Sequence, residues 1–245
     1  MCSAVGNPGS GTGTATSWIT FQSALFAAIT TIDRDYITIS RYNYRKHRAT
    51  GTALYERAYC YELYHQLRNA LGSRKPPFTY TVHGELSKLA DNSTTQRLTR
   101  AWMTLSTAQS QSRSSRRRPA SASGRGIRHR SVRGFIPDFI VHRAGSPDNL
   151  VVMEVKSSTS IAQRPGSAAV DIRKLAAFVD SGGLGYYKGI FLVFGDRPPL
   201  ITNPALVPSN IDILWHEPAS HRPIVIHSQG QQPVSGITNG IRLPL

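Results

Sequence analysis

Hydrophobic residues recur every three or four positions in three segments of the chain, which is typical of amphipathic helices that pack on a core. The segments are residues 18–32, 52–70 and 171–179. Gly72 follows the second segment and Gly182 follows the third, so we expect both helices to end at these points. Asp171 begins the third segment and is expected to cap its helix.

Runs rich in β-branched and aromatic residues predict strands between and after these helices. The runs are residues 78–86, 135–142, 150–156, 189–194 and 211–215, with a short one at 224–226. A segment of Gly, Ser, Pro, Asp and Asn separates the second run from the third, which indicates a β-hairpin. Helices and strands in this order predict an α/β fold with a central mixed β-sheet flanked by helices.

The composition along the chain suggests one domain with two tails. Residues 17–217 are long enough to bury one sizeable core. Residues 1–16 are mostly Gly, Ser, Thr and Ala and are expected to be flexible. Residues 107–130 are rich in Ser and Arg and are predicted to be a basic flexible insertion. Residues 218–245 are rich in Pro, Gly and Ser and are expected to be a partly ordered tail.

The charge of the chain points to a polyanionic partner. There are 29 Lys and Arg residues against 14 Asp and Glu residues, a formal net charge of +15. Nucleic acid, through phosphate contacts and counterion release, and an anionic membrane surface are competing partners, and charge alone does not choose between them. Polar residues interrupt residues 18–32, so no membrane span is expected. The two cysteines lack metal-ligand spacing, which favours a reducing, cytoplasmic setting.

Candidate chemistry is concentrated in the predicted hairpin. Glu154 and Lys156 are two positions apart, so they project from the same face of their strand, and the hairpin brings Asp138 beside them. Two carboxylates and an ammonium among apolar residues are costly to bury unless they bind a cation or each other. Carboxylate oxygens suit Mg²⁺, which retains waters and takes phosphate oxygens as further ligands. The alternative is an ordinary surface hairpin with Glu–Lys and Asp–Lys pairs.

Other enzyme classes lack their signatures in this sequence. The eight histidines include no pair with zinc-ligand spacing. There is no G-x-S-x-G sequence for an acyl hydrolase and no P-loop lysine for a nucleotide-driven motor.

The hairpin resembles the signature of the PD-(D/E)XK nuclease superfamily. Residues 136–140 read Ile-Pro-Asp-Phe-Ile, and residues 151–156 read Val-Val-Met-Glu-Val-Lys. Upstream, Glu56 begins a sequence similar to the first helix of that superfamily, and downstream residues 171–175 are similar to the helix that follows the catalytic strand. The resemblance covers residues 50–215 and implies a restriction-endonuclease-like core.

The resemblance also implies an activity and its residues. Asp138 and Glu154 would hold Mg²⁺, with Mn²⁺ as a substitute, Glu56 would support the metal site, and Lys156 would position the attacking water. The expected reaction is hydrolysis of phosphodiester bonds in nucleic acid, DNA preferred, in restriction or anti-phage defence. A homodimer or a partner protein fits many such enzymes. The alternative is a nucleic-acid-binding module on the same fold, inactive alone or activated by a partner.

Several assignments stay open at this point. Glu56 and Glu62 lie about 120° apart on a helix, so one of them faces the site, and Glu56 is favoured. Glu85 is either a further metal ligand or an ion-pair partner of Lys88. Lys174 is either a phosphate contact or a structural residue on the helix surface. The expected contact arm for nucleic acid is formed by basic residues of the insertion and its end, namely Arg116, Arg117, Arg118, Arg128, Arg130 and Arg133.

Overall fold

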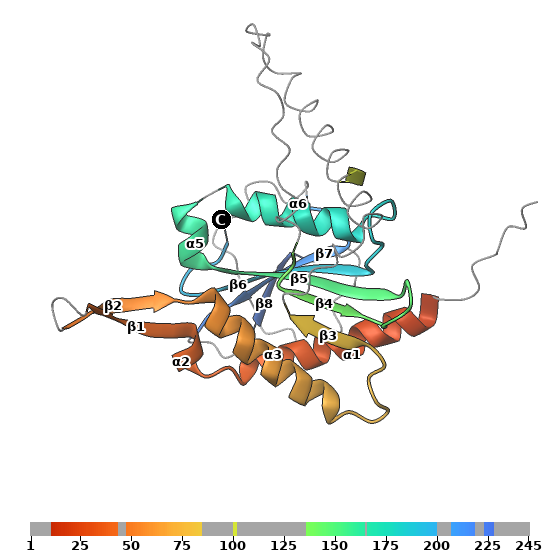
Figure 1. Cartoon of the computed structure of the whole chain (residues 1–245), viewed down its shortest axis with the longest axis horizontal. Coiled ribbons are helices and arrows are strands. Elements are labelled where there is room, and N and C mark those ends of the chain that lie inside the picture. The colour runs from red at the N-terminus through yellow and green to blue at the C-terminus, as the bar shows by residue number, and fades with distance from the viewer. Residues whose placement is uncertain are drawn as a thin grey trace, which may run out of the picture.

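The computed structural model describes residues 11–43, 48–84, 100–101, 136–164, 166–199, 207–218 and 223–227. Within these ranges a six-stranded mixed sheet is accompanied by helices, which confirms the predicted α/β class (Figure 1). None of the helices in these ranges is long and apolar enough to cross a membrane.

The sheet has the strand order β3-β4-β5-β6-β7-β8. Its central strands β5, β6 and β7 are parallel, whereas β3, β4 and β8 join antiparallel to their neighbours. The predicted hairpin is confirmed, because β4 pairs antiparallel with β5 and places Phe139 opposite Met153. The strands are β3 (Thr81–Gly84), β4 (Phe139–His142), β5 (Asn149–Ser157), β6 (Lys188–Phe194), β7 (Ile211–His216) and β8 (Pro223–His227).

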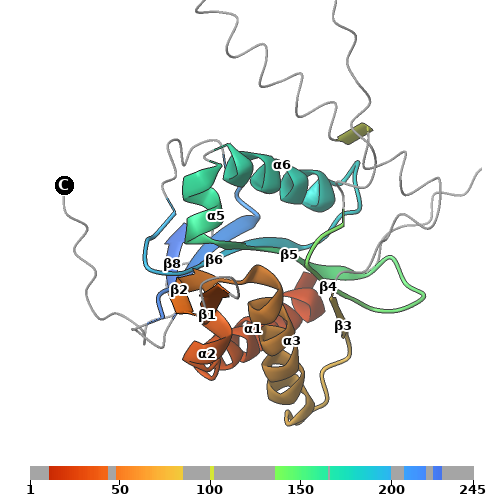
Figure 2. The same cartoon turned by 60° about the vertical axis from the view of Figure 1, so that its left-hand side comes forward.

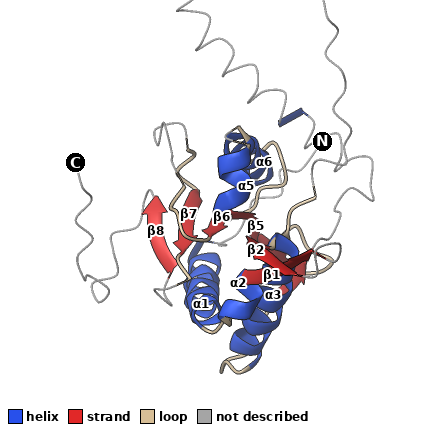
Figure 3. Ribbon diagram, turned by 90° about the vertical axis from the view of Figure 1, so that its left-hand side faces the viewer, coloured by secondary structure: helices blue, strands red, loops and turns tan. Residues whose placement is uncertain are grey.

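Helices cover both faces of this sheet (Figures 2 and 3). On one face lie α5 (Ser158–Gln163) and α6 (Ser167–Val179), and on the other lie α1 (Gly11–Thr30), α2 (Arg34–Ile37) and α3 (Glu56–Gly72). Alternate residues of a strand face opposite sides of a sheet. Val151, Met153 and Val155 of β5 therefore join the apolar cluster of α1 and α3, while Val152 joins the cluster of α6.

A two-stranded hairpin lies outside the main sheet and corrects one sequence-based boundary. β1 (Thr38–Asn43) and β2 (Arg48–Leu54) pair antiparallel and extend away from the body (Figure 1). The helix expected from residue 52 therefore begins only at Glu56. Thr50, Gly51 and Thr52 are weak helix formers, which favours the strand at this point.

The segment expected to be flexible, residues 1–16, is also corrected where the structure describes it. Helix α1 begins at Gly11, so residues 11–16 belong to a helix that Trp18 and Phe21 anchor in the core. At the other end, the short strand expected at residues 224–226 is confirmed, because β8 (Pro223–His227) pairs antiparallel with β7. Helix α6 likewise begins earlier than expected, at Ser167, and ends at Val179 as predicted.

Candidate functional site

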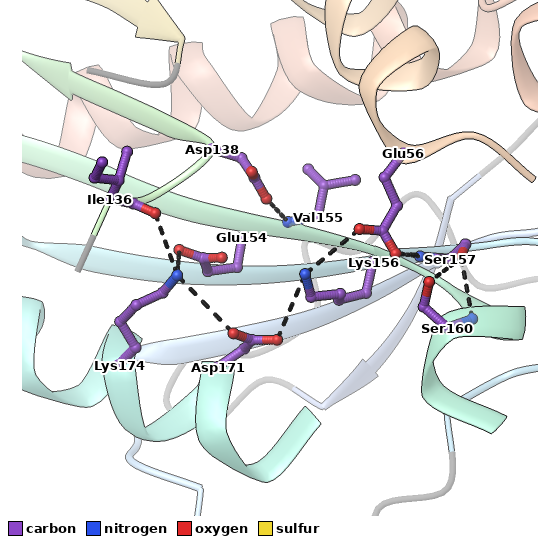
Figure 4. A network of polar contacts seen from close by, with 10 residues as sticks. All are labelled: Glu56, Ile136, Asp138, Glu154, Val155, Lys156, Ser157, Ser160, Asp171 and Lys174. Atoms are coloured by element: carbon purple, nitrogen blue, oxygen red, sulfur yellow. Dashed lines mark hydrogen bonds and ion pairs between the residues drawn. The ribbon is translucent and has the colours of Figure 1, made fainter. Parts of the chain in front are cut away.

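The end of β5 brings together the residues that the sequence singles out (Figure 4). Glu154 and Lys156 lie on this strand, two positions apart. Asp138 comes one residue before β4 rather than inside it, and its Oδ2 accepts a hydrogen bond of 2.7 Å from the Val155 N–H. The hairpin therefore fixes the Asp138 carboxylate against the strand that carries the other two groups.

Glu154 is buried, with 2% of its surface exposed. Burial, followed by the nearby Asp138 carboxylate, raises the pKa of Glu154 well above its usual value. Burial also raises the pKa of Asp138, although the Val155 N–H opposes this effect. Asp138, just before β4, and Glu154, on β5, therefore both hold a proton more tightly than a free carboxyl group does, and a nearby positive charge would favour their ionised forms.

Lys174 provides part of that positive charge. Its Nζ lies 2.6 Å from Oε1 of Glu154, and it donates a 3.3 Å hydrogen bond to the carbonyl of Ile136. Lys174 does not lie on the exposed surface of its helix, which was one of its two expected positions, because it is buried and faces the sheet from α6. The role expected for it as a phosphate contact therefore competes with a direct contact to Glu154.

Asp171 was expected to cap its helix, and this prediction is wrong. The cap of α6 is Gly166, and Asp171 lies inside the helix. Its carboxylate is 3.9 Å from both Nζ of Lys156 and Nζ of Lys174. The sequence signal for this position was the spacing of three residues between Asp171 and Lys174, which puts both on one face of a helix.

Glu56 approaches from the opposite side of Lys156 (Figure 4). One of its oxygens lies 3.4 Å from Nζ of Lys156, and the other accepts hydrogen bonds from the N–H and the hydroxyl of Ser157. Burial alone would raise the pKa of Glu56, but Ser160, Ser157 and Lys156 together lower it. Ser157 and Ser160 were not singled out from the sequence, because serines after a strand carry no distinctive signal.

The choice between Glu56 and Glu62 is settled by these contacts. Glu62 accepts a 2.6 Å hydrogen bond from Gln66, one turn further along α3. Glu56 begins α3 immediately after the β1–β2 hairpin and reaches the end of β5.

Lys156 lies between Glu56 and Asp171 and remains a cation. Burial on its own would lower the pKa of Lys156, but Asp171, Glu56 and the other carboxylates raise it above its usual value. The ammonium is therefore suited to donate hydrogen bonds and to neutralise negative charge rather than to accept a proton.

The charges of the site do not balance when all its groups are ionised. Four carboxylates, those of Glu56, Asp138, Glu154 and Asp171, face two ammonium groups. Three of the carboxylates and both ammonium groups form an alternating chain, in which Lys174 lies between Glu154 and Asp171, and Lys156 between Asp171 and Glu56 (Figure 4). The excess of two negative charges equals the charge of one divalent cation.

The donor set fits such a cation through two carboxylates. In the described ranges no group of three or more His, Cys, Asp or Glu residues could hold a metal ion, and Glu56 faces Lys156 and Ser157. Mg²⁺, however, is commonly bound by one or two carboxylates, with waters and phosphate oxygens completing its shell. Asp138 and Glu154 supply hard oxygen donors of this kind.

Some predicted site residues lie outside the described residues. These are Glu85 and the arginines of the predicted contact arm, Arg116, Arg117, Arg118, Arg128, Arg130 and Arg133, together with the insertion at residues 107–130.

Searches for similar proteins covered three kinds of reference. No family model, no curated protein and no solved structure matches this chain.

Proposed function

We propose that this protein is a metal-dependent nuclease of the PD-(D/E)XK type, with a restriction-endonuclease-like core. The observation that carries the proposal is that the partly buried Asp138 is fixed by the Val155 N–H against β5, the strand that carries the buried Glu154 and, two residues further along, Lys156. When all are ionised, the four carboxylates of the site exceed its two ammonium groups by the charge of one divalent cation. The motif that the sequence carries in this hairpin supports the same conclusion.

Asp138 and Glu154 would hold Mg²⁺, or Mn²⁺ in its place. When bound, the ion would supply Lewis-acid polarisation of the scissile phosphodiester and lower the pKa of a water. The Val155 N–H holds one oxygen of Asp138, which leaves its other oxygen for the cation. Burial raises the pKa of both carboxyls, so the ion would have to displace their protons, and its binding should strengthen as the pH rises.

Lys156 is the catalytic cation in this proposal. Glu56 and Asp171 flank its Nζ at 3.4 Å and 3.9 Å and limit the positions that the ammonium can take. From there it orients the attacking water by donating a hydrogen bond, and it stabilises the negative charge that develops on the phosphate. Glu56 acts through Lys156 and Ser157, so we assign it a positioning role instead of the metal-ligand role expected from the sequence.

Nucleic acid, DNA preferred, is the proposed substrate. A formal net charge of +15 favours a polyphosphate partner through phosphate contacts and counterion release. Restriction or anti-phage defence in the cytoplasm is the setting we propose, with a homodimer or a partner protein completing the active assembly.

A nucleic-acid-binding module on the same fold is the second candidate. The observation that favours it is that Lys174 lies within 2.6 Å of Glu154, and Glu56 is engaged by Lys156 and Ser157. A site in which Glu154 keeps its contact to Lys174 and holds no metal ion would bind nucleic acid without cutting it. The nuclease would cut nucleic acid when metal is added, whereas the binding module would leave it intact.

The test is cleavage of supercoiled plasmid and of labelled single-stranded DNA and RNA, with Mg²⁺, with Mn²⁺ and with EDTA. We expect cutting that requires metal and is lost in Asp138→Asn and Lys156→Met. The matched control is Asp148→Asn, because Asp148 lies at the opposite end of the same hairpin, where it pairs with Arg143 at 3.4 Å. Wild type that binds every substrate but cuts none would favour the binding module.

A further inference from the structure

Lys174 and Asp171 belong to the candidate site but have no part in the chemical step described above. Both are buried on α6, three residues apart. The Lys174 ammonium lies 2.6 Å from Oε1 of Glu154, one of the two carboxylates assigned to the cation. Two cations compete for one carboxylate, because each raises the electrostatic cost of placing the other beside it.

Lys174 has two other acceptors within a short distance of its ammonium. The carbonyl of Ile136 accepts its hydrogen bond at 3.3 Å, and Oδ1 of Asp171 lies at 3.9 Å. Burying an ammonium group without a partner costs free energy, because nothing offsets the loss of its hydration. An ammonium group that moves from one acceptor to another avoids this cost. Lys174 can therefore leave Glu154 without becoming an unpaired buried charge.

Asp171 links this lysine to Lys156. Its two oxygens lie 3.9 Å from the two ammonium groups, one oxygen for each. If Lys174 moved toward Asp171, it would still have a carboxylate partner from the same site. Lys156 would keep its contact with Glu56, whose oxygen lies 3.4 Å from Nζ of Lys156.

We propose that Lys174 is the internal counter-ion of Glu154 in the metal-free protein and that it yields this carboxylate to the divalent cation by moving toward Asp171. The inference rests on the metal-dependent function proposed above and adds a control of metal affinity to it. Lys174 and Asp171 are positioning residues in this account: they set how tightly the cation is held and do not touch the reacting atoms.

The proposal makes opposite predictions for these two neighbours. Lys174→Met leaves four carboxylates facing one ammonium group, so the site attracts a divalent cation more strongly. Asp171→Asn leaves three carboxylates facing two ammonium groups and removes the acceptor that receives Lys174, so the cation binds more weakly. Damage to the fold would weaken binding in both variants, so the opposite signs separate the proposal from a structural role.

The experiment is calorimetric titration of Mn²⁺ into the full-length protein at about pH 8 and constant salt, without nucleic acid. We expect Lys174→Met to lower the dissociation constant for Mn²⁺ about tenfold and Asp171→Asn to raise it about tenfold. Lys174→Gln, which retains a donor for the Ile136 carbonyl, should behave like Lys174→Met.

The matched control is Lys188→Met, because Lys188 is also a buried lysine in an ion pair, 3.5 Å from Asp212. It should leave the affinity for Mn²⁺ unchanged. Wild type that binds Mn²⁺ while Lys174→Met binds it equally or more weakly would overturn the counter-ion proposal and leave the metal-dependent function intact. Wild type that binds no Mn²⁺ would overturn both.

Discussion

Glu154 is a carboxylate whose ionisation the fold disfavours. Burial and the neighbouring Asp138 carboxylate raise its pKa well above the usual value of 4.5. A group whose pKa is higher in the folded state than in the unfolded state binds its proton more tightly when folded. Its contribution to stability is fully present below the unfolded pKa and is lost as the pH rises through the folded pKa.

Glu154→Gln should remove this pH dependence in the absence of metal. In EDTA, the free energy of unfolding of wild type should fall relative to that of the variant as the pH rises above 4.5. Urea denaturation at a series of pH values measures this difference. Mg²⁺ should then stabilise wild type but not the variant. A difference between the two proteins that does not change with pH would show that the fold leaves the ionisation of Glu154 unperturbed.

Among single residues, those that lie close together along the chain could be predicted best. Asp138, Glu154 and Lys156 are joined by a hairpin, so strand periodicity and a turn suffice to bring them together. Asp171 was misread as a helix cap, because α6 begins four residues earlier, at Ser167. Its spacing from Lys174 puts both residues on one face of the helix, but its contact with Lys156 depends on how α6 packs across the sheet.

At the scale of elements, the sequence pattern predicted which segments form strands and helices better than it predicted where some of them begin. The β4–β5 hairpin and the end of α6 at Val179 agree with the sequence-based expectation. The start of α3 does not agree with the expectation. Leu54 has the apolar spacing of the helix, but it is the last residue of β2. A short hairpin next to a helix gives the same apolar pattern as a longer helix, so tertiary context decides between them.

The turn after α6 depends on a glycine whose substitution should be costly. A Cβ at Gly183 would lie 1.9 Å from the carbonyl oxygen of Ala177, a backbone atom that cannot move alone. Gly183→Ala should lower the free energy of unfolding by about 2 kcal/mol or more. Urea denaturation in EDTA measures this loss.

Gly72→Ala is the control for this turn. Nothing lies within 4 Å of a Cβ at Gly72, which ends α3. This substitution should change stability by less than about 1 kcal/mol. Equal effects of the two substitutions would contradict the packing described for the end of α6.

At the scale of the whole molecule, the layer arrangement could be predicted from the order of elements, but the completed sheet could not. The alternation of helices and strands was enough for the α/β class, and the parallel centre of the sheet follows from the crossover through α6. The detached β1–β2 hairpin was not expected, because its weakly apolar strands lack a clear alternation. β2 ends at Leu54 and α3 begins at Glu56, so this hairpin leads directly into the helix whose first residue reaches the site.

The net charge of the molecule predicts nucleic-acid binding that depends strongly on salt. With a formal charge of +15, affinity for a labelled DNA duplex in EDTA should fall on the order of 10³-fold between about 50 mM and about 200 mM salt. Fluorescence anisotropy measures this fall. Asp138→Asn should show the same salt dependence as wild type, since phosphate contacts and not the metal pair supply this affinity. Affinity that does not change with salt would contradict an electrostatic mode of binding.

The central claim is that Asp138 and Glu154 act as one unit that holds a divalent cation for phosphodiester hydrolysis. The most direct measurement is the single-turnover cleavage rate in Mg²⁺ of Asp138→Asn, Glu154→Gln and the double variant, beside wild type. We expect each single variant to lose on the order of 10³-fold in rate and the double variant to lose hardly more, because either substitution already removes the site. A wild-type rate in either single variant, or losses that multiply in the double variant, would contradict the claim.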